Sequence, residues 1–379
     1  MPGAADSHDE RSASAVTSAE EAGSDLGGDF LEGYRLVKAE TVTFDRSHRG
    51  RLLVSGRAPG QMLGGVLTGR IPGPLSELTG SEVARGSRAY SAMLTPKGKM
   101  LSDLYVYRLP GEAEAFLIDV PAAGLESVRD HFAKVLPPRL ARVQDASSDF
   151  RFTTFAGPGA AGVVAKLVGM ETPELSGLSG DDVVVVGGII IGRSADLSVP
   201  SFDVLIPTDR WDALSTSLAA AGVGSAGTDV WHSLRLEAGT PEFGLDMDAE
   251  TIPVEAGIDE RAIDHDKGCY TGQEVIIRIR HRGRVNKHLR TLTLTGPDVV
   301  PGHVASRDIA HADLAPGAAL FLVGEAKAVG SITSVAPSPD VGGMIALGYV
   351  RREVEPRSEV LVGGQDGPRA KVLERGSVA

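Results

Sequence analysis

The first half of the chain alternates short apolar runs with stretches of helical spacing. Residues 51–56 read as a strand, and a helical pattern follows around residues 61–67. Three further strands are expected at 87–94, 100–108 and 115–120, the first two joined by the turn Thr95-Pro96-Lys97-Gly98. An amphipathic helix at 125–136 ends at Pro137-Pro138. This order of strand, helix, strands and helix predicts a ferredoxin-like unit.

A second unit of the same order is expected after residue 149. Its strands fall at 150–155, 183–186 and 202–206, and its helices at 160–168 and 210–221, with a further helix at 228–237. After residue 288, short alternating runs separated by Gly and Pro are typical of a small antiparallel barrel. We therefore predict an α+β protein with two ferredoxin-like α/β domains, at 30–148 and 149–287, and a C-terminal antiparallel β-barrel at 288–379.

Composition indicates a soluble protein of ordinary type. The 379 residues are 42% hydrophobic, and the net charge of -12 argues against indiscriminate nucleic-acid binding. Residues 1–29 lack the apolar segment of a signal peptide and are rich in small and acidic residues, which predicts a disordered tail. Runs of about 18 apolar residues are missing, so we expect a cytoplasmic protein that does not enter membranes.

The single cysteine stands in the string Lys267-Gly268-Cys269-Tyr270-Thr271-Gly272-Gln273-Glu274. One cysteine excludes a disulfide framework and any metal centre built from several cysteines of this chain. Thr271 and Glu274 have capping-box spacing, so a helix starting at Gly272 would place Cys269 at its positive end, beside Lys267, and favour the thiolate. A buried, unreactive cysteine is the alternative.

This string resembles the signature of YgfZ-type folate-binding proteins, the branch of the glycine-cleavage T-protein superfamily linked to iron–sulfur cluster assembly and repair. The resemblance implies three domains around a central channel that binds tetrahydrofolate or a one-carbon derivative. Cys269 would be catalytic at the rim of the channel, and Lys267, Tyr270 and Gln273 would contact the cofactor. Iron–sulfur assembly or cluster-containing proteins, among them tRNA-modifying enzymes, would be the partners, without direct binding of nucleic acid and without a metal site.

Tyr90 and Asp103 form a second candidate site, on the two strands joined by the predicted hairpin. The segment resembles the T-protein sequence in which a tyrosine contacts folate and an aspartate is catalytic, although the first acid of the T-protein pair is Ser102 here. Asp103 could accept a proton from a bound pterin. The alternative is an aspartate on the solvent face of a strand.

Arg235 and Glu237 lie in the string R-L-E-A-G, which resembles the T-protein string that binds folate, so we expect both to contact the cofactor. T-proteins read the pterin with a glutamate from the second domain, and the corresponding residues 187–193 contain no acid. Its absence speaks against a working aminomethyltransferase.

Two further patterns have several interpretations. Residues 157–162 fit G-x-G-x-x-G, but the following acids, Asp181 and Asp182, precede a strand instead of ending one, which favours a strand-to-helix turn over a dinucleotide site.

A basic stretch could hold a folate polyglutamate tail, a phosphate-bearing substrate such as tRNA or an acidic partner, or could be a solvated surface. It comprises Arg278, Arg280, His281, Arg282, Arg284, Lys287, His288 and Arg290.

Three functions follow from these patterns. The first is a tetrahydrofolate-binding protein that supports iron–sulfur cluster assembly or repair through Cys269. The second is a folate-dependent aminomethyltransferase of glycine cleavage, which Asp103 favours. The third is a non-catalytic folate sensor or interaction module.

Overall fold

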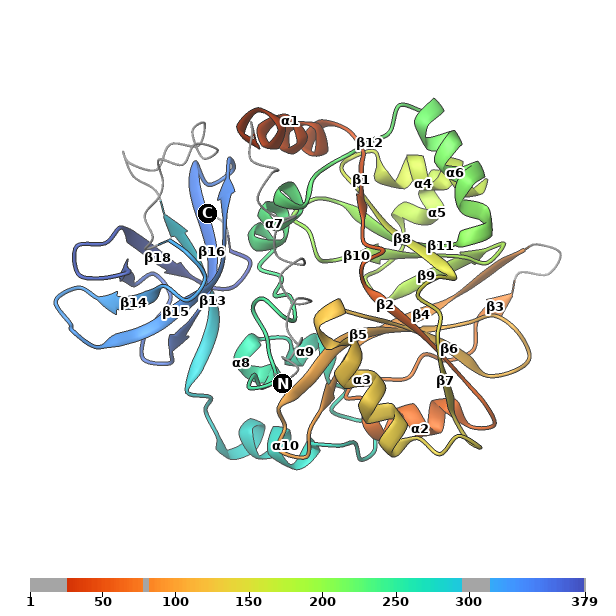
Figure 1. Cartoon of the computed structure of the whole chain (residues 1–379), viewed down its shortest axis with the longest axis horizontal. Helices are drawn as coiled ribbons and strands as arrows, with labels where there is room; N and C mark the ends of the chain where they lie inside the picture. Colours follow the sequence, from red (N-terminus) through yellow and green to blue (C-terminus); the bar gives the residue numbers. More distant parts are fainter. Residues whose placement is uncertain (1–25, 78–81, 295–313, 378–379) are drawn as a thin grey trace, which may run out of the picture.

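The computed structural model describes residues 26–77, 82–294 and 314–377. They form a mixed α/β structure with two parts, a twelve-stranded sheet and a closed six-stranded antiparallel barrel (Figure 1). The expected fold class is therefore confirmed, with the difference that the two α/β units share one continuous sheet. Among the described residues, none of the helices is long and apolar enough to cross a membrane.

The first half of the sheet has the strand order β4-β5-β6-β2-β7. The strand runs at 100–108 and 115–120 were predicted with their observed bounds, whereas β7 was not predicted. The elements are β2 (Gly50–Ser55), α2 (Pro59–Val66), β3 (Ser76–Glu77), β4 (Val83–Leu94), β5 (Met100–Arg108), β6 (Ala115–Val120), α3 (Ala122–Val135) and β7 (Arg142–Asp145).

The second half repeats this order as β9-β10-β11-β8, which continues into β1 and β12. β4 pairs with β9 in antiparallel fashion and so joins the two halves edge to edge. This repeated order bears out a duplication of architecture. The elements are β1 (Val42–Asp45), β8 (Phe150–Ala156), α4 (Ala160–Val168), α5 (Thr172–Ser176), β9 (Asp182–Val186), β10 (Ile189–Ser194), β11 (Ser201–Pro207), α6 (Thr208–Ala220) and β12 (Gly224–Ser225).

The two faces of the sheet are covered differently. Helices α2 and α3 pack on one face of the first half, and α4 and α6 do the same for the second half (Figure 1). The opposite face packs against residues 243–276, which include the short helices α8 (Pro253–Ala256) and α9 (Asp259–Ala262) and the start of α10 (Gln273–Arg282). Because strand side chains alternate, Tyr90, Ala92 and Leu94 face this segment, whereas Met93 faces the helices.

The barrel joins the sheet through α1 (Leu26–Ala39) and α7 (Thr228–Glu237), which lie between the two parts in Figure 1. Glu237 is buried there and accepts hydrogen bonds from Tyr34 Oη at 2.7 Å, Ser198 Oγ at 2.7 Å and Ser338 Oγ at 2.6 Å. The barrel strands are β13 (Lys287–Leu294), β14 (Ala319–Leu322), β15 (Ala328–Ser338), β16 (Gly343–Arg351), β17 (Glu359–Val362) and β18 (Arg369–Leu373).

Three local expectations need correction or are resolved by these elements. The tail was expected to reach residue 29, but α1 begins at Leu26; residues 1–25 lie outside the described residues. Helix α10 has Gly272 as its N-cap, with φ of 85° and no side-chain cap, so Thr271 and Glu274 do not form a capping box. The glycine pattern is a strand-to-helix turn: Gly157 has φ of 120°, and an added Cβ would lie 1.8 Å from the Glu40 carbonyl oxygen.

Candidate functional site

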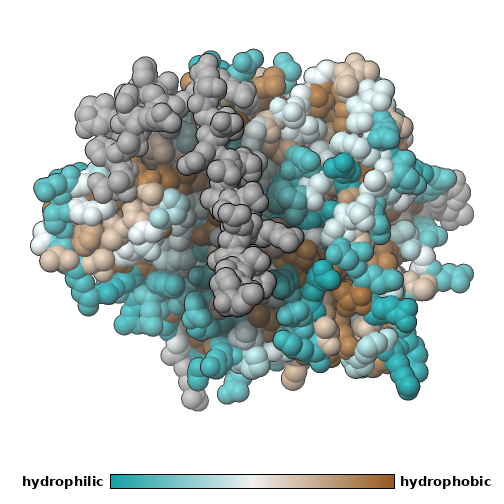
Figure 2. All heavy atoms as spheres, in the orientation of Figure 1, coloured by the Kyte–Doolittle hydropathy of each residue, from teal (hydrophilic) through white to brown (hydrophobic). Residues whose placement is uncertain are grey.

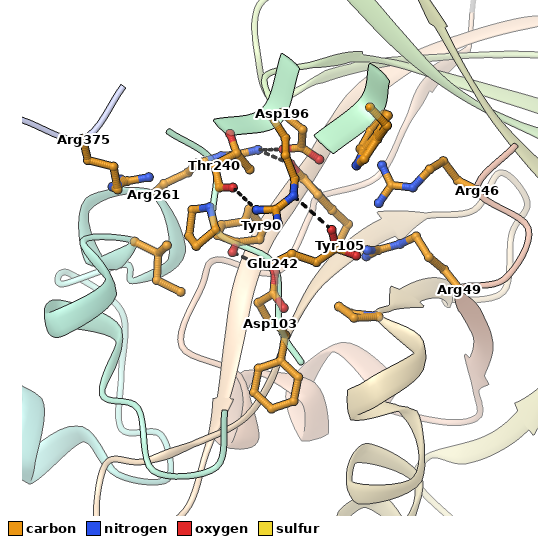
Figure 3. A pocket seen from close by; sticks show the side chains of 16 residues that line it. Arg46, Arg49, Tyr90, Asp103, Tyr105, Asp196, Thr240, Glu242, Arg261 and Arg375 are labelled. Atoms are coloured by element: carbon orange, nitrogen blue, oxygen red, sulfur yellow. Dashed lines mark hydrogen bonds and ion pairs between the residues drawn. The ribbon is translucent and has the colours of Figure 1, made fainter. Parts of the chain in front are cut away.

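A narrow pocket lies on the face of the sheet that the segment 239–286 covers, and its residues come from both halves of the sheet, from α7 and from the end of the barrel (Figure 3). Its cavity volume is about 60 Å³, room for a few water molecules. The lining residues are Arg46, Arg49, Tyr90, Asp103, Tyr105, Pro121, Asp196, Trp231, Arg235, Thr240, Pro241, Glu242, Phe243, Ile258, Arg261 and Arg375.

Tyr90 and Asp103 meet in this pocket because of strand register. Tyr90 pairs with Tyr105 and Ala92 with Asp103 across β4 and β5, so all four side chains lie on one face. The Tyr90 hydroxyl donates a hydrogen bond of 2.8 Å to Oδ2 of Asp103. Ser102, the neighbour of Asp103 on β5, points to the opposite face of the sheet, where it lies against Gly124. A serine at this position, in place of the first acid of the T-protein pair, therefore does not alter the pocket.

Asp103 is a buried carboxyl group with one free oxygen. It is 7% exposed, and its Oδ1 has no hydrogen-bond partner among the described residues. Burial raises the pKa of Asp103 to about 6, although the nearby Arg49 cation and the Tyr90 hydrogen bond oppose the shift. Near neutral pH, Asp103 is thus a carboxylate close to its pKa, which suits a group that accepts and returns a proton.

The carboxylates and arginines of the pocket are mostly paired. Arg49 contacts Asp119 through Nε and Nη2, both at 2.7 Å from Oδ2. Arg261 lies over the Tyr90 ring, 4.5 Å from its centroid, donates to the Tyr105 hydroxyl and contacts Asp196 at 3.3 Å. Arg375 closes one side by donating to the carbonyl oxygens of Gly239 (2.7 Å) and Gly257. The pocket is consequently a polar site with aromatic walls, in which most of the charged groups are held by internal contacts.

Arg235 lines the pocket as expected, but its donors are engaged within the protein. Its Nη1 contacts Asp246 Oδ2 at 2.7 Å and the Thr240 carbonyl oxygen at 3.1 Å, and its Nη2 donates to Ser334 Oγ at 3.0 Å. These bonds tie α7 to β15 and to the loop that forms one pocket wall. A role for Arg235 in ligand binding stays a prediction.

The other predicted cofactor residues are not among those that line this pocket. Glu237 serves the contact between α1, α7 and the barrel, as described above. The Lys267 ammonium donates to the carbonyl oxygens of Leu67 (2.7 Å) and Gly69 (2.8 Å), and burial lowers its pKa to about 8. Tyr270 is buried in the apolar core and Gln273 begins α10. Their roles in cofactor binding stay predictions.

Cys269 is exposed, which excludes the interpretation of a buried, unreactive thiol, but it does not line the pocket of Asp103. One of the two supports that the sequence suggested for thiolate formation is present, because α10 begins at Gln273 with Gly272 as its N-cap, shortly after Cys269. The other is not found, because the Lys267 ammonium is held by two carbonyl groups. A catalytic role for Cys269 stays a prediction.

We expect Cys269 to react with iodoacetamide at neutral pH as an ordinary exposed thiol does, within about threefold of the same chain in urea. The sulfur is exposed, so access does not slow the reaction, and the Lys267 ammonium is bound to carbonyl groups. The measurement is the rate of carboxyamidomethylation by mass spectrometry, with free glutathione as the reference. A rate more than tenfold above that of glutathione would support the prediction from the sequence that Cys269 is an activated nucleophile.

Besides Phe243, eight lining residues that bring charge or aromatic surface to the pocket were not found from the sequence. Asp196 follows β10 and lies three positions beyond residues 187–193, the segment that corresponds to the T-protein glutamate. The position of Asp196 shortly after the end of β10 gave no signal, because that strand was not predicted. The others come from segments far apart in the chain: Arg46, Arg49, Tyr105, Trp231, Glu242, Arg261 and Arg375.

The basic stretch lies on α10 and at the start of β13, away from this pocket. Arg278, Arg280, His281 and Arg284 are exposed. Two other members take part in internal contacts, since Lys287 lies 3.8 Å from Glu255 and Arg290 pairs with Glu374. The side chain of Arg282 lies outside the described residues. On the face of the molecule seen in Figure 2, hydrophilic residues predominate and apolar ones lie in small groups between them.

Comparison with known proteins gives a consistent result. Residues 30–267 match the model of the GCVT N-terminal domain, and residues 287–374 match that of the glycine cleavage T-protein C-terminal barrel domain. A curated relative from Thermosynechococcus vestitus, named aminomethyltransferase, is 28% identical over 84% of this chain and 79% of its own. One of the same name from Rubrobacter xylanophilus is 28% identical over 87% of this chain and 81% of its own.

A solved structure has the same fold. It is the glycine cleavage system aminomethyltransferase T from Bartonella henselae, with a TM-score of 0.73 over 91% of this chain and 88% of the other, at 21% sequence identity.

Proposed function

Because the chain belongs to the glycine cleavage T-protein family, we propose that it is a folate-dependent aminomethyltransferase. The observation that carries the proposal is Asp103, a buried carboxyl group with a free oxygen in a pocket walled by tyrosines. The aminomethyltransferase relatives cover most of the chain and support the same activity.

The expectation that the chain supports iron–sulfur cluster assembly, through partners such as tRNA-modifying enzymes, was wrong. The relatives, named aminomethyltransferase at 26–28% identity over 83–87% of the chain, overturn it. Membership of the YgfZ branch, which rests on the string around Cys269, and a cytoplasmic location stay predictions.

Tetrahydrofolate is the cofactor of this family, in agreement with the expectation from the sequence. The donor and acceptor groups of the pocket fit a reduced pterin. Asp103 Oδ1 can accept from a ring N–H, and Tyr90, Tyr105 and Phe243 offer apolar ring surface. Tetrahydrofolate supplies the amine nitrogens that take up a one-carbon unit.

The pocket must widen before such a molecule enters. Its volume is about 60 Å³, whereas pockets for small molecules usually measure about 300–1,000 Å³. Arg261 is the side chain best placed to make room, since it is 37% exposed and covers the Tyr90 ring. Its contacts with Asp196 and the Tyr105 hydroxyl would have to be released for this movement.

The protein's own groups divide the work at the reacting centre. The Tyr90 hydroxyl holds Oδ2 of Asp103, so Oδ1 is the oxygen that accepts or returns a proton. Arg49, which is charge-coupled to Asp103, keeps the pKa of Asp103 from rising further. Trp231, Phe243 and Ile258 supply apolar wall surface beside this carboxyl group.

The direct test is an assay of aminomethyl transfer. The chain is mixed with tetrahydrofolate and an aminomethyl-lipoyl carrier protein, and methylene-tetrahydrofolate is measured. We expect product with multiple turnovers. Saturable folate binding, seen as a rise in melting temperature, without any product would refute the enzyme and favour the folate sensor.

The raised pKa of Asp103 has a consequence for stability. A carboxyl whose folded pKa is about 6 instead of 3.8 stabilises the fold below pH 4, and this contribution is lost as the pH rises through 6. The asparagine of Asp103→Asn does not titrate. Between pH 4 and pH 8 the wild type should therefore lose about 3 kcal/mol of its free energy of unfolding relative to this variant. Urea unfolding across this range measures the difference; a difference that stays constant with pH would contradict the assignment.

A further inference from the structure

Arg46, in the loop after β1, is a buried cation in the pocket of Asp103. It is 6% exposed, and its guanidinium lies 3.7 Å from the centroid of the Trp231 ring and 5.9 Å from that of Phe152. Its backbone N–H donates to the Phe152 carbonyl oxygen at 2.8 Å, which holds the loop in place. In the part of the chain that the structure describes, no hydrogen bond or ion pair reaches the guanidinium.

Other buried arginines of the protein do have such partners. Arg88 contacts Asp203 at 3.0 Å, and Arg235 contacts Asp246 at 2.7 Å. Burial, and then the neighbouring Arg49, lower the pKa of Arg46, whereas Asp196, Glu242 and Asp203 favour its charge from a distance. Asp196 is held by Arg261 and Glu242 lies near Arg235. An ionised group in this position is costly unless something binds it.

The surroundings indicate what kind of group would bind. Five arginines and three carboxylic residues line the pocket, so the pocket is cationic in a protein of net charge -12. Arg46 and Arg49 lie side by side and point into it (Figure 3). Trp231 covers one face of the Arg46 guanidinium, which leaves the N–H groups at its edge, a planar fork that matches the two oxygens of a carboxylate.

We propose that Arg46, assisted by the free Nη1 of Arg49, binds a carboxylate group of a ligand in the pocket of Asp103. A carboxylate is small enough for a cavity of about 60 Å³ and completes the hydrogen bonds that Arg46 lacks. This site goes beyond the proposed aminomethyl transfer, and its test does not depend on that reaction.

The test uses acetate as the probe, at constant ionic strength in sodium chloride, with the full chain. We expect acetate to raise the melting temperature of the wild type saturably, because it binds the native state. Acetamide, which is neutral, should have no effect. Acetate binding can also be followed by the fluorescence of Trp231. Because the chain has two tryptophans, this measurement uses a Trp211→Phe variant that keeps Arg46.

Variants separate binding from a structural role. Arg46→Gln should weaken acetate binding at least about tenfold. Arg46→Lys keeps the charge but not the planar fork, so its affinity for acetate should lie between those of the wild type and Arg46→Gln. Arg151→Gln is the matched control, because Arg151 also lies over a tryptophan, 5.9 Å from the Trp211 ring, outside the pocket. Without acetate, Arg46→Gln should melt at the wild-type temperature or above it, since a buried bare charge has been removed.

Several results would overturn the proposal. Acetate that does not saturate, or that binds Arg46→Gln as well as the wild type, would exclude the site. A melting temperature of Arg46→Gln several degrees below that of the wild type would assign Arg46 to holding Trp231 in place. Stabilisation by inorganic phosphate and not by acetate would refute the carboxylate.

Discussion

Replacement of Asp103 by asparagine is expected to lower kcat for one-carbon transfer by about 10²–10⁴-fold, the usual contribution of a positioned acid–base group. The affinity for tetrahydrofolate should change far less, because the amide keeps the shape of the side chain and its bond with Tyr90. Steady-state kinetics with tetrahydrofolate and the aminomethyl carrier would measure both. For the wild type, kcat should rise with pH through about 6, as Asp103 ionises.

Two variants sharpen this test. Tyr90→Phe removes the hydrogen bond that lowers the pKa of Asp103, so its pH–rate profile should shift to higher pH with a smaller loss of kcat. Asp130→Asn, on the exposed side of α3, is the matched control and should leave kcat unchanged. An Asp103→Asn enzyme within threefold of the wild type would remove Asp103 from the proton transfer.

Truncation of Arg235 to alanine is expected to destabilise the fold by about 3–5 kcal/mol, because it leaves Asp246 buried and unpaired. The loss would remove one of the hydrogen bonds between α7 and β15 of the barrel and loosen the pocket wall at Thr240. Urea unfolding measures the change, and the affinity for tetrahydrofolate should then be determined at a temperature where the variant is fully folded.

A double-mutant cycle with Asp246→Ala tests the origin of this effect. If the pair acts together, the double variant should be less destabilised than the sum of the two single variants, because neither charge is left alone. Additive losses would show that Arg235 stabilises through its packing or through Ser334. An Arg235→Ala protein of wild-type stability that no longer binds folate would instead support the role predicted from the sequence.

How far the sequence leads depends on whether a feature is local. The apolar runs of β5 and β6 were predicted with their observed bounds, and the hairpin placed Tyr90 and Asp103 on neighbouring strands. β10 was missed, although Ile189-Ile190-Ile191 is also an apolar run in a strand that is buried on both faces. Short β1 and β7 gave too little pattern to detect.

The site shows the same division. Arg46, Asp196 and Arg261 reach the pocket from three separate segments, and spacing along the chain contains no information on such a meeting. The capping box near Cys269 was wrong for a related reason: a hydroxyl–carboxylate spacing predicts a cap when the helix is capped at Thr271, whereas the N-cap is Gly272, which has no side chain.

The antiparallel pairing of β4 with β9 has a consequence for any attempt to divide the protein. Each half contributes a strand whose backbone groups are satisfied by the other half over residues 83–87 and 182–186. A fragment of either half would present that row of N–H and C=O groups to solvent, which invites pairing with a second copy of itself. Split fragments should therefore self-associate through this edge, or reassemble with each other when co-expressed.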